Sequence, residues 1–399
     1  MCGGMVEEKF DFGNQPVSNA FLRADELREE EFFWLAVGIC TSCGMVQLMQ
    51  ETPRTRMFHE NYPYRSCSSS IMRKHFERTA LHLMETELTG PGDLIVEIGC
   101  NDGVLLKAVA DAGVRHLGID ASAGAVEVAR AKGVRAKVEF FEESTAARLR
   151  EEHGPAKVIF SANTFSHIAY IGSVLAGVDR LLADDGVFVF EDRYLGDIIA
   201  HNYFDQIYDE HFYLFSVRSV TAMAERFGFE LVEAERLPVH GGSMRYKFAR
   251  PGRRRVSGLD DLLEQEDRLG LTRPETFERF GANIDRIRRD LVALLRDLRA
   301  QGKTVAGYGA TSRSTTVTNF CGIGPDLIPF VSDTTPEKQG RLTPGSHIPV
   351  HAPDRFAAPY PDYALLFAWN HADEILAKER RFHDAGGRWI FYVPDVHIV

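Results

Sequence analysis

Residues 205–216, DQIYDEHFYLFS, bring a phenol, a carboxylate and an imidazole close together at Tyr208, Glu210 and His211. A histidine has a reference pKa near 6.5, so His211 has a suitable strength to remove a proton at neutral pH. Glu210 could orient or polarise that ring, and Tyr208 could donate a hydrogen bond to a developing anion. Each residue alone is more often structural, so the catalytic interpretation depends on what other segments bring to His211.

Two other segments carry groups of a similar kind. Asn163 and His167 follow the apolar run KVIFSA, and the 205–216 segment comes after the apolar run GVFVF. In a doubly wound sheet the carboxyl ends of the strands line the ligand crevice, which places these groups at one edge. Tyr62 and Tyr64 lie in HENYPYRSCSSS, whose pattern predicts a loop over the cleft. We therefore expect a single site that combines these segments.

A glycine-containing turn in VEIGCNDG (96–103) predicts a cofactor site. Gly99 permits a tight turn, Gly103 allows close backbone approach, and Glu97 can reach a polar group. This spacing differs from the Gly-x-Gly-x-x-Gly of dinucleotide sites, and Asp120 ends the next apolar run, where it could accept hydrogen bonds from ribose hydroxyls. The pattern favours S-adenosylmethionine over an α/β turn without a ligand. The predicted cofactor residues are Glu97, Gly99, Asn101, Gly103, Asp120, Phe140, Phe141 and Asn163.

These residues require an α/β fold that positions them. Short apolar runs alternate with helix-like stretches such as SAGAVEVARAKG, which is typical of a parallel sheet flanked by helices. A charged helical stretch and a second set of apolar runs, including TVAGYGA and WIFYVPD, predict another α/β sheet. We expect a zinc-binding and substrate-loop module over 1–75, a Rossmann-type methyltransferase domain over 76–240, and a Rossmann-like domain over 241–399.

The N-terminal cysteines predict a structural zinc site. Cys40 and Cys43 form Cys-x-x-Cys before Gly44, and Cys2 precedes a pair of glycines in a similar way. Zinc normally takes four protein ligands, and the fourth could be His59, Cys67 or water. Buried reduced thiols without a metal are the alternative.

The second set of apolar runs contains GYGATSRSTT (307–316), whose glycines and hydroxyls suit a phosphate group. Tyr308, Thr311, Ser312 and Arg313 are the predicted substrate-binding residues in this segment. The alternative is a folding relic of a duplicated domain, without a ligand.

Composition limits the partners. The chain has 399 residues, of which 44% are apolar and 26% charged, with a net charge of −11. That length predicts two or three domains, and the negative charge disfavours nucleic acid. No apolar run approaches the roughly 20 residues that span a bilayer, and the first residues lack the pattern of a signal peptide. We expect a cytoplasmic monomer with neither membrane nor nucleic-acid partners.

Taken together, segments along the whole chain resemble the ketosugar C-methyltransferases of antibiotic deoxysugar pathways, particularly C-3' methyltransferases of the D-tetronitrose and kijanose type. The resemblance rests on DFGNQPVSNAFL, CTSCGMVQL, NYPYRSCSSS, VEIGCNDG, SANTFSHI, EDRYLGD, DQIYDEHFYLFS, HGGSMRY, GYGATSRSTTVTNFCGIG and SDTTPEKQGRLTPGSHIPV. It implies zinc ligands at Cys2, Cys40 and Cys43, although one cysteine of the family pattern is missing at the start. It also implies active-site residues at Tyr62, His167, Tyr208, Glu210 and His211.

The resemblance implies S-adenosylmethionine-dependent methylation of C-3' in a dTDP-4-keto-deoxysugar, possibly a 3-amino sugar, for antibiotic biosynthesis. Methylating carbon requires a carbanion, and the C-3' proton becomes acidic only beside a 4'-ketone. The site therefore needs a base, a donor for the enolate oxygen and a sulfonium methyl group in line. Two alternatives are an enzyme of this fold that acts on another ketone, for example an epimerase, and a sensor that only binds S-adenosylmethionine.

Overall fold

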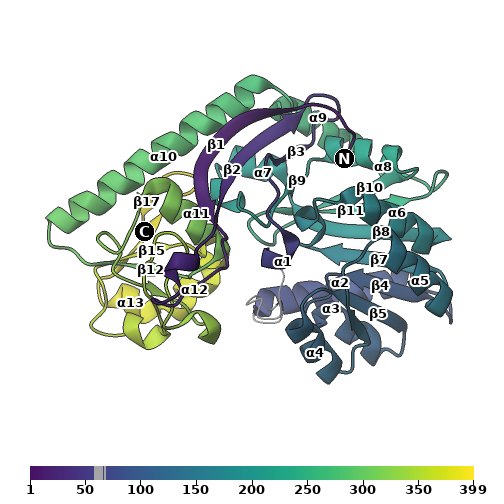
Figure 1. Ribbon diagram of the computed structural model, residues 1–399, viewed down its shortest axis with the longest axis horizontal. Coiled ribbons are helices and arrows are strands. Elements are labelled where there is room, and N and C mark those ends of the chain that lie inside the picture. The colour runs from purple at the N-terminus through teal and green to yellow at the C-terminus, as the bar shows by residue number, and fades with distance from the viewer. Residues whose placement is uncertain (58–65, 67–68) are drawn as a thin grey trace.

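The computed structural model describes residues 1–57, 66 and 69–399, and it contains three β-sheets (Figure 1). Tyr62 and Tyr64, as well as His59 and Cys67, lie outside the described residues. The α/β architecture predicted from the sequence is confirmed, with an N-terminal module and two sheets that contain parallel strands.

The N-terminal sheet has the order β1-β2-β3-β9, and its strands are antiparallel. Three strands come from the start of the chain: β1 (Val6–Pro16), β2 (Phe32–Cys40) and β3 (Val46–Leu48). The fourth, β9 (Tyr213–Leu214), belongs to the opening motif DQIYDEHFYLFS. This sheet therefore holds the chain immediately after His211. A 3-10 turn (Leu27–Glu29) and the short helix α1 (Arg54–Met57) complete the described part of the module.

The central sheet has the order β10-β11-β8-β7-β4-β5-β6. Strands β4 (Leu94–Ile98), β5 (Arg115–Asp120), β6 (Ala136–Val138), β7 (Ala156–Ala162) and β8 (Leu182–Arg193) are parallel, which explains their nearly continuous apolar sequences. Strands β10 (Glu230–Leu237) and β11 (Ser243–Ala249) add an antiparallel edge. The associated helices are α2 (Ser70–Thr86), α3 (Val104–Asp111), α4 (Ala123–Ala131), α5 (Glu143–His153), α6 (Ile171–Leu181), α7 (Leu195–Ala200) and α8 (Val217–Arg226).

Both expected domain limits fall within this unit. The limit at 75/76 lies within helix α2, and the limit at 240/241 lies between the paired strands β10 and β11. The central sheet therefore continues to Ala249, because the hairpin that contains HGGSMRY returns to pair with β8.

The C-terminal unit follows helices α9 (Leu259–Leu269) and α10 (Pro274–Ala300). Its sheet has the order β14-β13-β12-β15-β16-β17, in which only the pair β16·β17 is antiparallel. The strands are β12 (Val305–Tyr308), β13 (Val331–Ser332), β14 (Val350–His351), β15 (Tyr363–Leu366), β16 (Arg388–Phe391) and β17 (His397–Ile398), with helices α11 (Ser312–Cys321), α12 (Ala372–Lys378) and α13 (Arg380–Asp384). Strands β1 and β2 reach from the central to the C-terminal unit, and α10 lies along the outer edge (Figure 1).

Residues 204–211, which we call the junction segment, are buried between all three units. The backbone N–H of Ser18 in the N-terminal module donates to Asp209 at 3.1 Å. Thr316 of α11 donates to the Ile207 carbonyl at 2.9 Å, and the indole of Trp369 donates to Asp205 at 2.6 Å. The fold therefore fixes the backbone around His211 from every side.

Among the described residues, no helix combines the length and apolar character needed to cross a membrane.

Candidate active site

A pocket opens at the carboxyl ends of the central parallel strands. It brings together most of the cofactor residues predicted from the sequence and one predicted catalytic residue. These are Gly99, Asn101, Asp120, Phe140, Phe141, Asn163 and His167.

The turn after β4 is shaped by its contacts with Asp120 and Thr164. Gly99 has φ +73°, and a Cβ there would collide with the Thr164 side chain. The Asp120 carboxylate accepts the backbone N–H of Asn101 at 2.9 Å and that of Ser122 at 2.8 Å. Asp120 therefore fixes the turn that borders the pocket, as well as presenting a carboxylate to it.

Asn163, at the end of the neighbouring strand β7, presents a hydrogen-bond acceptor. Its backbone has φ +51°, and its N–H donates to the Glu191 carbonyl at 2.7 Å. The buried side-chain oxygen makes no hydrogen bond within the described part of the chain. It is therefore placed to accept a hydrogen bond from a ligand in the pocket.

Glu97 and Gly103 lie outside the residues that line this pocket. Burial, followed by the charges of Asp120 and Asp102, raises the pKa of Glu97 well above its ordinary value. Gly103 precedes α3 with φ +74°, and a Cβ there would meet Ala129 at 3.0 Å. Glu97 thus lies beneath the site as a neutral carboxyl group, and Gly103 serves the packing of α3.

An aromatic wall closes another side of the pocket, and the N-terminal module contributes to it. The guanidinium of Arg54 lies 4.3 Å from the ring centroid of Phe140 and 4.7 Å from that of Tyr170. Arg54 also donates to Glu142 at 2.5 Å. Phe141 lines the pocket but is also part of the central core. Arg54 and Tyr170 also line the pocket but were not among the residues predicted from the sequence.

His211 does not line this pocket but lies next to His167, which does. Its ring centroid is 5.2 Å from that of His167, and its side chain is fully buried. The Gln206 carbonyl lies 2.5 Å from Nδ1 and can only accept, so Nδ1 carries a proton. Nε2 makes no hydrogen bond among the described residues. In the neutral ring this nitrogen holds the lone pair that can take a proton.

Tyr208 and Glu210, the neighbours of His211 that were predicted from the sequence, differ in their contacts. The ring of Tyr208 packs against that of His211 at a centroid distance of 4.0 Å and a tilt of 41°, and burial raises the pKa of its phenol. Glu210 accepts a hydrogen bond from Asn19 at 2.5 Å. The group that orients His211 is therefore the Gln206 carbonyl, in place of the Glu210 carboxylate considered from the sequence.

The interior around His211 is basic. Burial, followed by the positive charge of Arg193, lowers the pKa of both His211 and His167 well below the ordinary value. Burial and the charges of Arg193 and Arg313 do the same for His240. The histidines are therefore neutral at physiological pH.

The four substrate residues predicted in the C-terminal unit do not all lie together, because Tyr308 lies apart from Thr311, Ser312 and Arg313. Arg313 is buried, donates to the His240 carbonyl at 3.0 Å and lies 5.0 Å from the ring centroid of Trp369. Thr311 caps α11 by accepting the Ser314 N–H, and Ser312 is half-buried beside it. Tyr308 is not brought to this group. Its ring packs on Phe356 and Trp389, and its hydroxyl donates to Glu379 at 2.7 Å.

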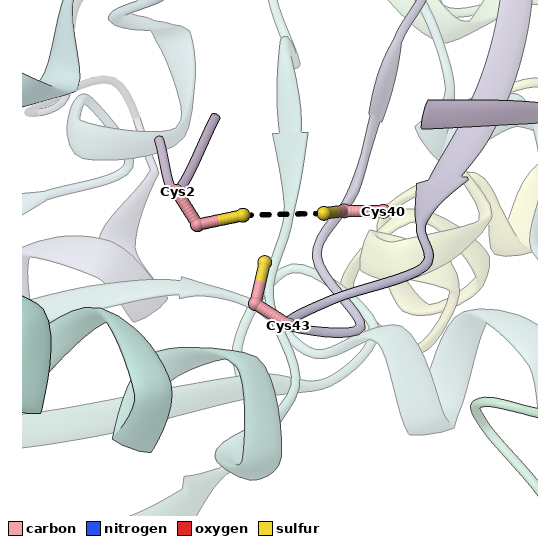
Figure 2. A group of neighbouring side chains, drawn as sticks. All are labelled: Cys2, Cys40 and Cys43. Atoms are coloured by element: carbon pink, nitrogen blue, oxygen red, sulfur yellow. Dashed lines mark hydrogen bonds between the residues drawn. The ribbon is translucent and has the colours of Figure 1, made fainter. Parts of the chain in front are cut away.

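Cys2, Cys40 and Cys43 converge at the edge of the N-terminal sheet, with their sulfur atoms directed toward one another (Figure 2). All three sulfur atoms lie within 4.8 Å of one another. Gly4 is required nearby, because a Cβ there would lie 2.5 Å from Ser42 Oγ and 2.9 Å from Cys40 Sγ. Three converging thiols fit three positions of a tetrahedral zinc site. No fourth histidine, cysteine or carboxylate joins this group within residues 1–57, 66 and 69–399.

The Cys40→Ser variant tests this site. We expect the purified wild type to contain about one zinc per chain, and the variant to lose the metal and melt at a lower temperature. Metal analysis by mass spectrometry and thermal denaturation measure the two effects. Cys321→Ser is the matched control, since Cys321 is buried in the C-terminal unit and should leave the zinc content unchanged. Equal metal content in wild type and Cys40→Ser would contradict the zinc site.

The Asp120→Asn variant tests the cofactor pocket. The substitution removes a charged acceptor and places an amide against two backbone N–H groups, so affinity for S-adenosylmethionine should fall by about 10- to 150-fold. Isothermal titration calorimetry measures this loss. Asp184→Asn makes the same change in charge at an exposed position and should bind normally. Unchanged affinity in Asp120→Asn would mean that another acid binds the ribose hydroxyls of the cofactor.

Comparisons with known proteins agree with this geometry. Residues 1–58 match the "Putative zinc binding domain" family, residues 72–234 the "Methyltransferase domain" family, and residues 238–394 the "C-methyltransferase C-terminal domain" family. The C-methyltransferase NovU of Streptomyces niveus is 34% identical over 97% of this chain and 93% of its own length.

Two other similarities are partial. The mRNA cap guanine-N(7) methyltransferase of Saccharomyces cerevisiae is 28% identical over 27% of this chain and 25% of its own length. The crystal structure of magnesium protoporphyrin IX methyltransferase from Synechocystis, with bound S-adenosylmethionine, covers 45% of this chain and 79% of its own, at 15% identity and a TM-score of 0.35.

The match to NovU covers nearly the whole of both chains, and the three family models follow one another in the order of the structural units. The predicted dependence on S-adenosylmethionine is confirmed, and the match to a zinc-binding family together with the three converging thiols supports the predicted structural zinc. This chain belongs to the family of S-adenosylmethionine-dependent C-methyltransferases, in which a zinc-binding domain precedes the methyltransferase domain and a C-methyltransferase C-terminal domain follows it.

Proposed function

We propose that this enzyme methylates C-3' of a dTDP-linked 4-keto-deoxysugar. The observation that carries the proposal is His211, whose Nδ1 proton is held by a backbone carbonyl while Nε2 is without a hydrogen-bond partner among the described residues. A neutral imidazole fixed in this tautomer is a general base with one available nitrogen. His167 lines the cofactor pocket and lies between that pocket and His211.

The chemistry needs one proton transfer and one methyl transfer. His211 Nε2 takes the C-3' proton, the electron pair of the C–H bond forms the C-3'–C-4' double bond, and the carbonyl π electrons move onto the C-4' oxygen. C-3' of the enolate then attacks the methyl group that the sulfonium supplies, and the S–CH₃ bond breaks with its electron pair on sulfur. The proton stays on His211 until solvent removes it.

The other residues have roles that their positions support. The pKa of the Tyr208 phenol is raised, so the phenol stays protonated and can donate to the substrate beside His211. His167 can contact the methyl donor or the sugar, because it borders the cofactor pocket. Arg313 suits the anionic nucleotide portion, since its Nη1 is buried without a hydrogen bond in the described structure. Tyr62 keeps the active-site role that the resemblance implies, and Tyr64 remains a predicted substrate-binding residue of the same loop.

Product analysis tests the reaction. With S-adenosylmethionine and a dTDP-4-keto-deoxysugar, the wild type should yield a sugar heavier by one methylene group. His211→Asn keeps the size of the ring and one hydrogen bond but removes the base, so turnover should fall by about 10²- to 10⁴-fold. His383→Asn, at an exposed position on α13, is the matched control.

Hydrogen exchange separates this proposal from its alternatives. In D₂O without methyl donor, the wild type should exchange the C-3' hydrogen for deuterium, whereas His211→Asn should not. Exchange with no mass gain when donor is present would favour an epimerase. Native exchange in His211→Asn would assign the base to another residue, with His167 the nearest candidate.

The pH dependence follows from the lowered pKa of His211. The base must be neutral, so activity falls when the pH drops through its pKa. Burial and Arg193 place that pKa well below 6.5, and the rate should therefore stay level as the pH falls from 7.5 through 6.5 before it declines. Initial rates at saturating substrate, with cofactor binding measured in parallel, give this profile. Half-maximal activity at pH 6.5 or above would contradict it.

A further inference from the structure

Arg193 is a buried cation whose ion pair within the described structure is a long one, 3.7 Å to Asp192. The residue ends strand β8, and only 9% of its surface is exposed. Nε and Nη1 make no hydrogen bond with any described residue. Burying charged donors without partners is costly, which indicates that they act on a ligand.

One carboxylate lies near Arg193, but its hydrogen bonds are used elsewhere. Asp192 Oδ1 is 3.7 Å from Nη1 of Arg193. That oxygen accepts the Ser166 hydroxyl at 2.6 Å, and Oδ2 accepts the Ser166 N–H at 2.9 Å. Asp192 thus fixes the turn that carries His167, and the donors of Arg193 are left for another acceptor.

Several structural relations place Arg193 beside the base. Tyr194, the residue after strand β8, forms a β-bridge with Phe215, which follows His211 closely in the sequence. The charge of Arg193 lowers the pKa of His211 and His167. Arg193 does not line the cofactor pocket. Arg193 therefore lies near His211 and His167, outside the residues that line the cofactor pocket.

We infer that Arg193 donates a hydrogen bond, from Nε or Nη1, to the carbonyl oxygen next to the deprotonated carbon, and so stabilises the enolate. This inference rests on the proposed function. When His211 takes the proton, the C–H electron pair becomes the C=C bond and the carbonyl π pair becomes a lone pair on oxygen. A guanidinium beside that oxygen stabilises the developing negative charge through its positive charge and through the N–H group that donates to the oxygen.

The positive charge of Arg193 also affects the protonation of His211. A cation near His211 disfavours the imidazolium, so the ring is neutral before reaction, while the cation also makes the substrate C–H group more acidic. The charged and titratable groups around His211 are Arg193, His167 and Arg313, together with the phenol of Tyr208. Asp192, with a pKa raised by burial to about 6, is the nearby acid on the side of Arg193.

Three substitutions separate the charge of Arg193 from its shape. Arg193→Met removes charge and donors, Arg193→Gln keeps neutral donors, and Arg193→Lys keeps the charge. Arg193→Met should lower both turnover and C-3' exchange by about 10²- to 10³-fold, with KM nearly unchanged. Arg193→Lys should recover at least about tenfold of this loss, and Arg193→Gln less. Arg250→Met is the control. Arg250 follows strand β11, which pairs with β8, but lies at the far end of that pairing from Arg193 and pairs with Asp179.

The pH profile gives a readout that a structural role would not move. Without the neighbouring cation the pKa of His211 rises, so the acid limb of Arg193→Met should shift to higher pH than in the wild type. Native exchange rates in Arg193→Met, or an unmoved acid limb, would overturn the inference. A raised KM with native exchange at saturating substrate would also overturn it and assign Arg193 to the diphosphate. Absence of exchange in the wild type would instead count against the proposed function itself. If Arg193→Met does not fold, the comparison of Arg193→Lys with Arg193→Gln decides the question.

Discussion

The hydrogen bond between His211 Nδ1 and the Gln206 carbonyl is the constraint on which the rest of the site depends. It fixes the tautomer, and it works only because the junction segment is held in place. The Gln206 side chain donates to the His240 carbonyl at 2.9 Å, and Arg313 of the C-terminal unit donates to the same carbonyl at 3.0 Å. Ser18 and Thr316 hold the same segment from the N-terminal and C-terminal units. His211, the proposed base, therefore belongs to the central unit but is positioned by all three units.

Charge is divided between the two halves of the site in a way that suits the two reactants. The cofactor side contains buried acids, with Glu97 close enough to Asp120, Asp102 and Glu191 for their charges to raise its pKa. The base side contains Arg193 and Arg313 beside neutral histidines. A sulfonium is attracted to the first environment and an enolate or a diphosphate to the second. The reacting carbon is thus expected where the two environments meet, near His167 and His211.

The sequence was informative where a function requires a local pattern. Strand ends predicted from apolar runs placed Asp120, Asn163 and His167 around one pocket, and the cysteine spacing predicted the thiol cluster. Tyr308 was different, because a glycine-rich segment does not say which side of the strand an aromatic ring occupies, and here it packs into an apolar cluster. The role given to Glu210 depended on a side-chain direction, and Asn19, far away in sequence, determines it. Arg193 was missed, although a cation directly after the buried run FVFED was visible. That its Nε and Nη1 make no hydrogen bond with the described residues appears only in three dimensions.

The most direct test of this account is the protonation state of the His211 ring. Nitrogen NMR of histidine-labelled enzyme, with the resonance assigned by its loss in His211→Asn, distinguishes the two neutral tautomers from the imidazolium. The account predicts a neutral ring at neutral pH, with the proton on Nδ1 and an unprotonated Nε2, that persists below pH 6.5. A ring protonated on Nε2, or an imidazolium at neutral pH, would contradict the assignment of His211 as the base.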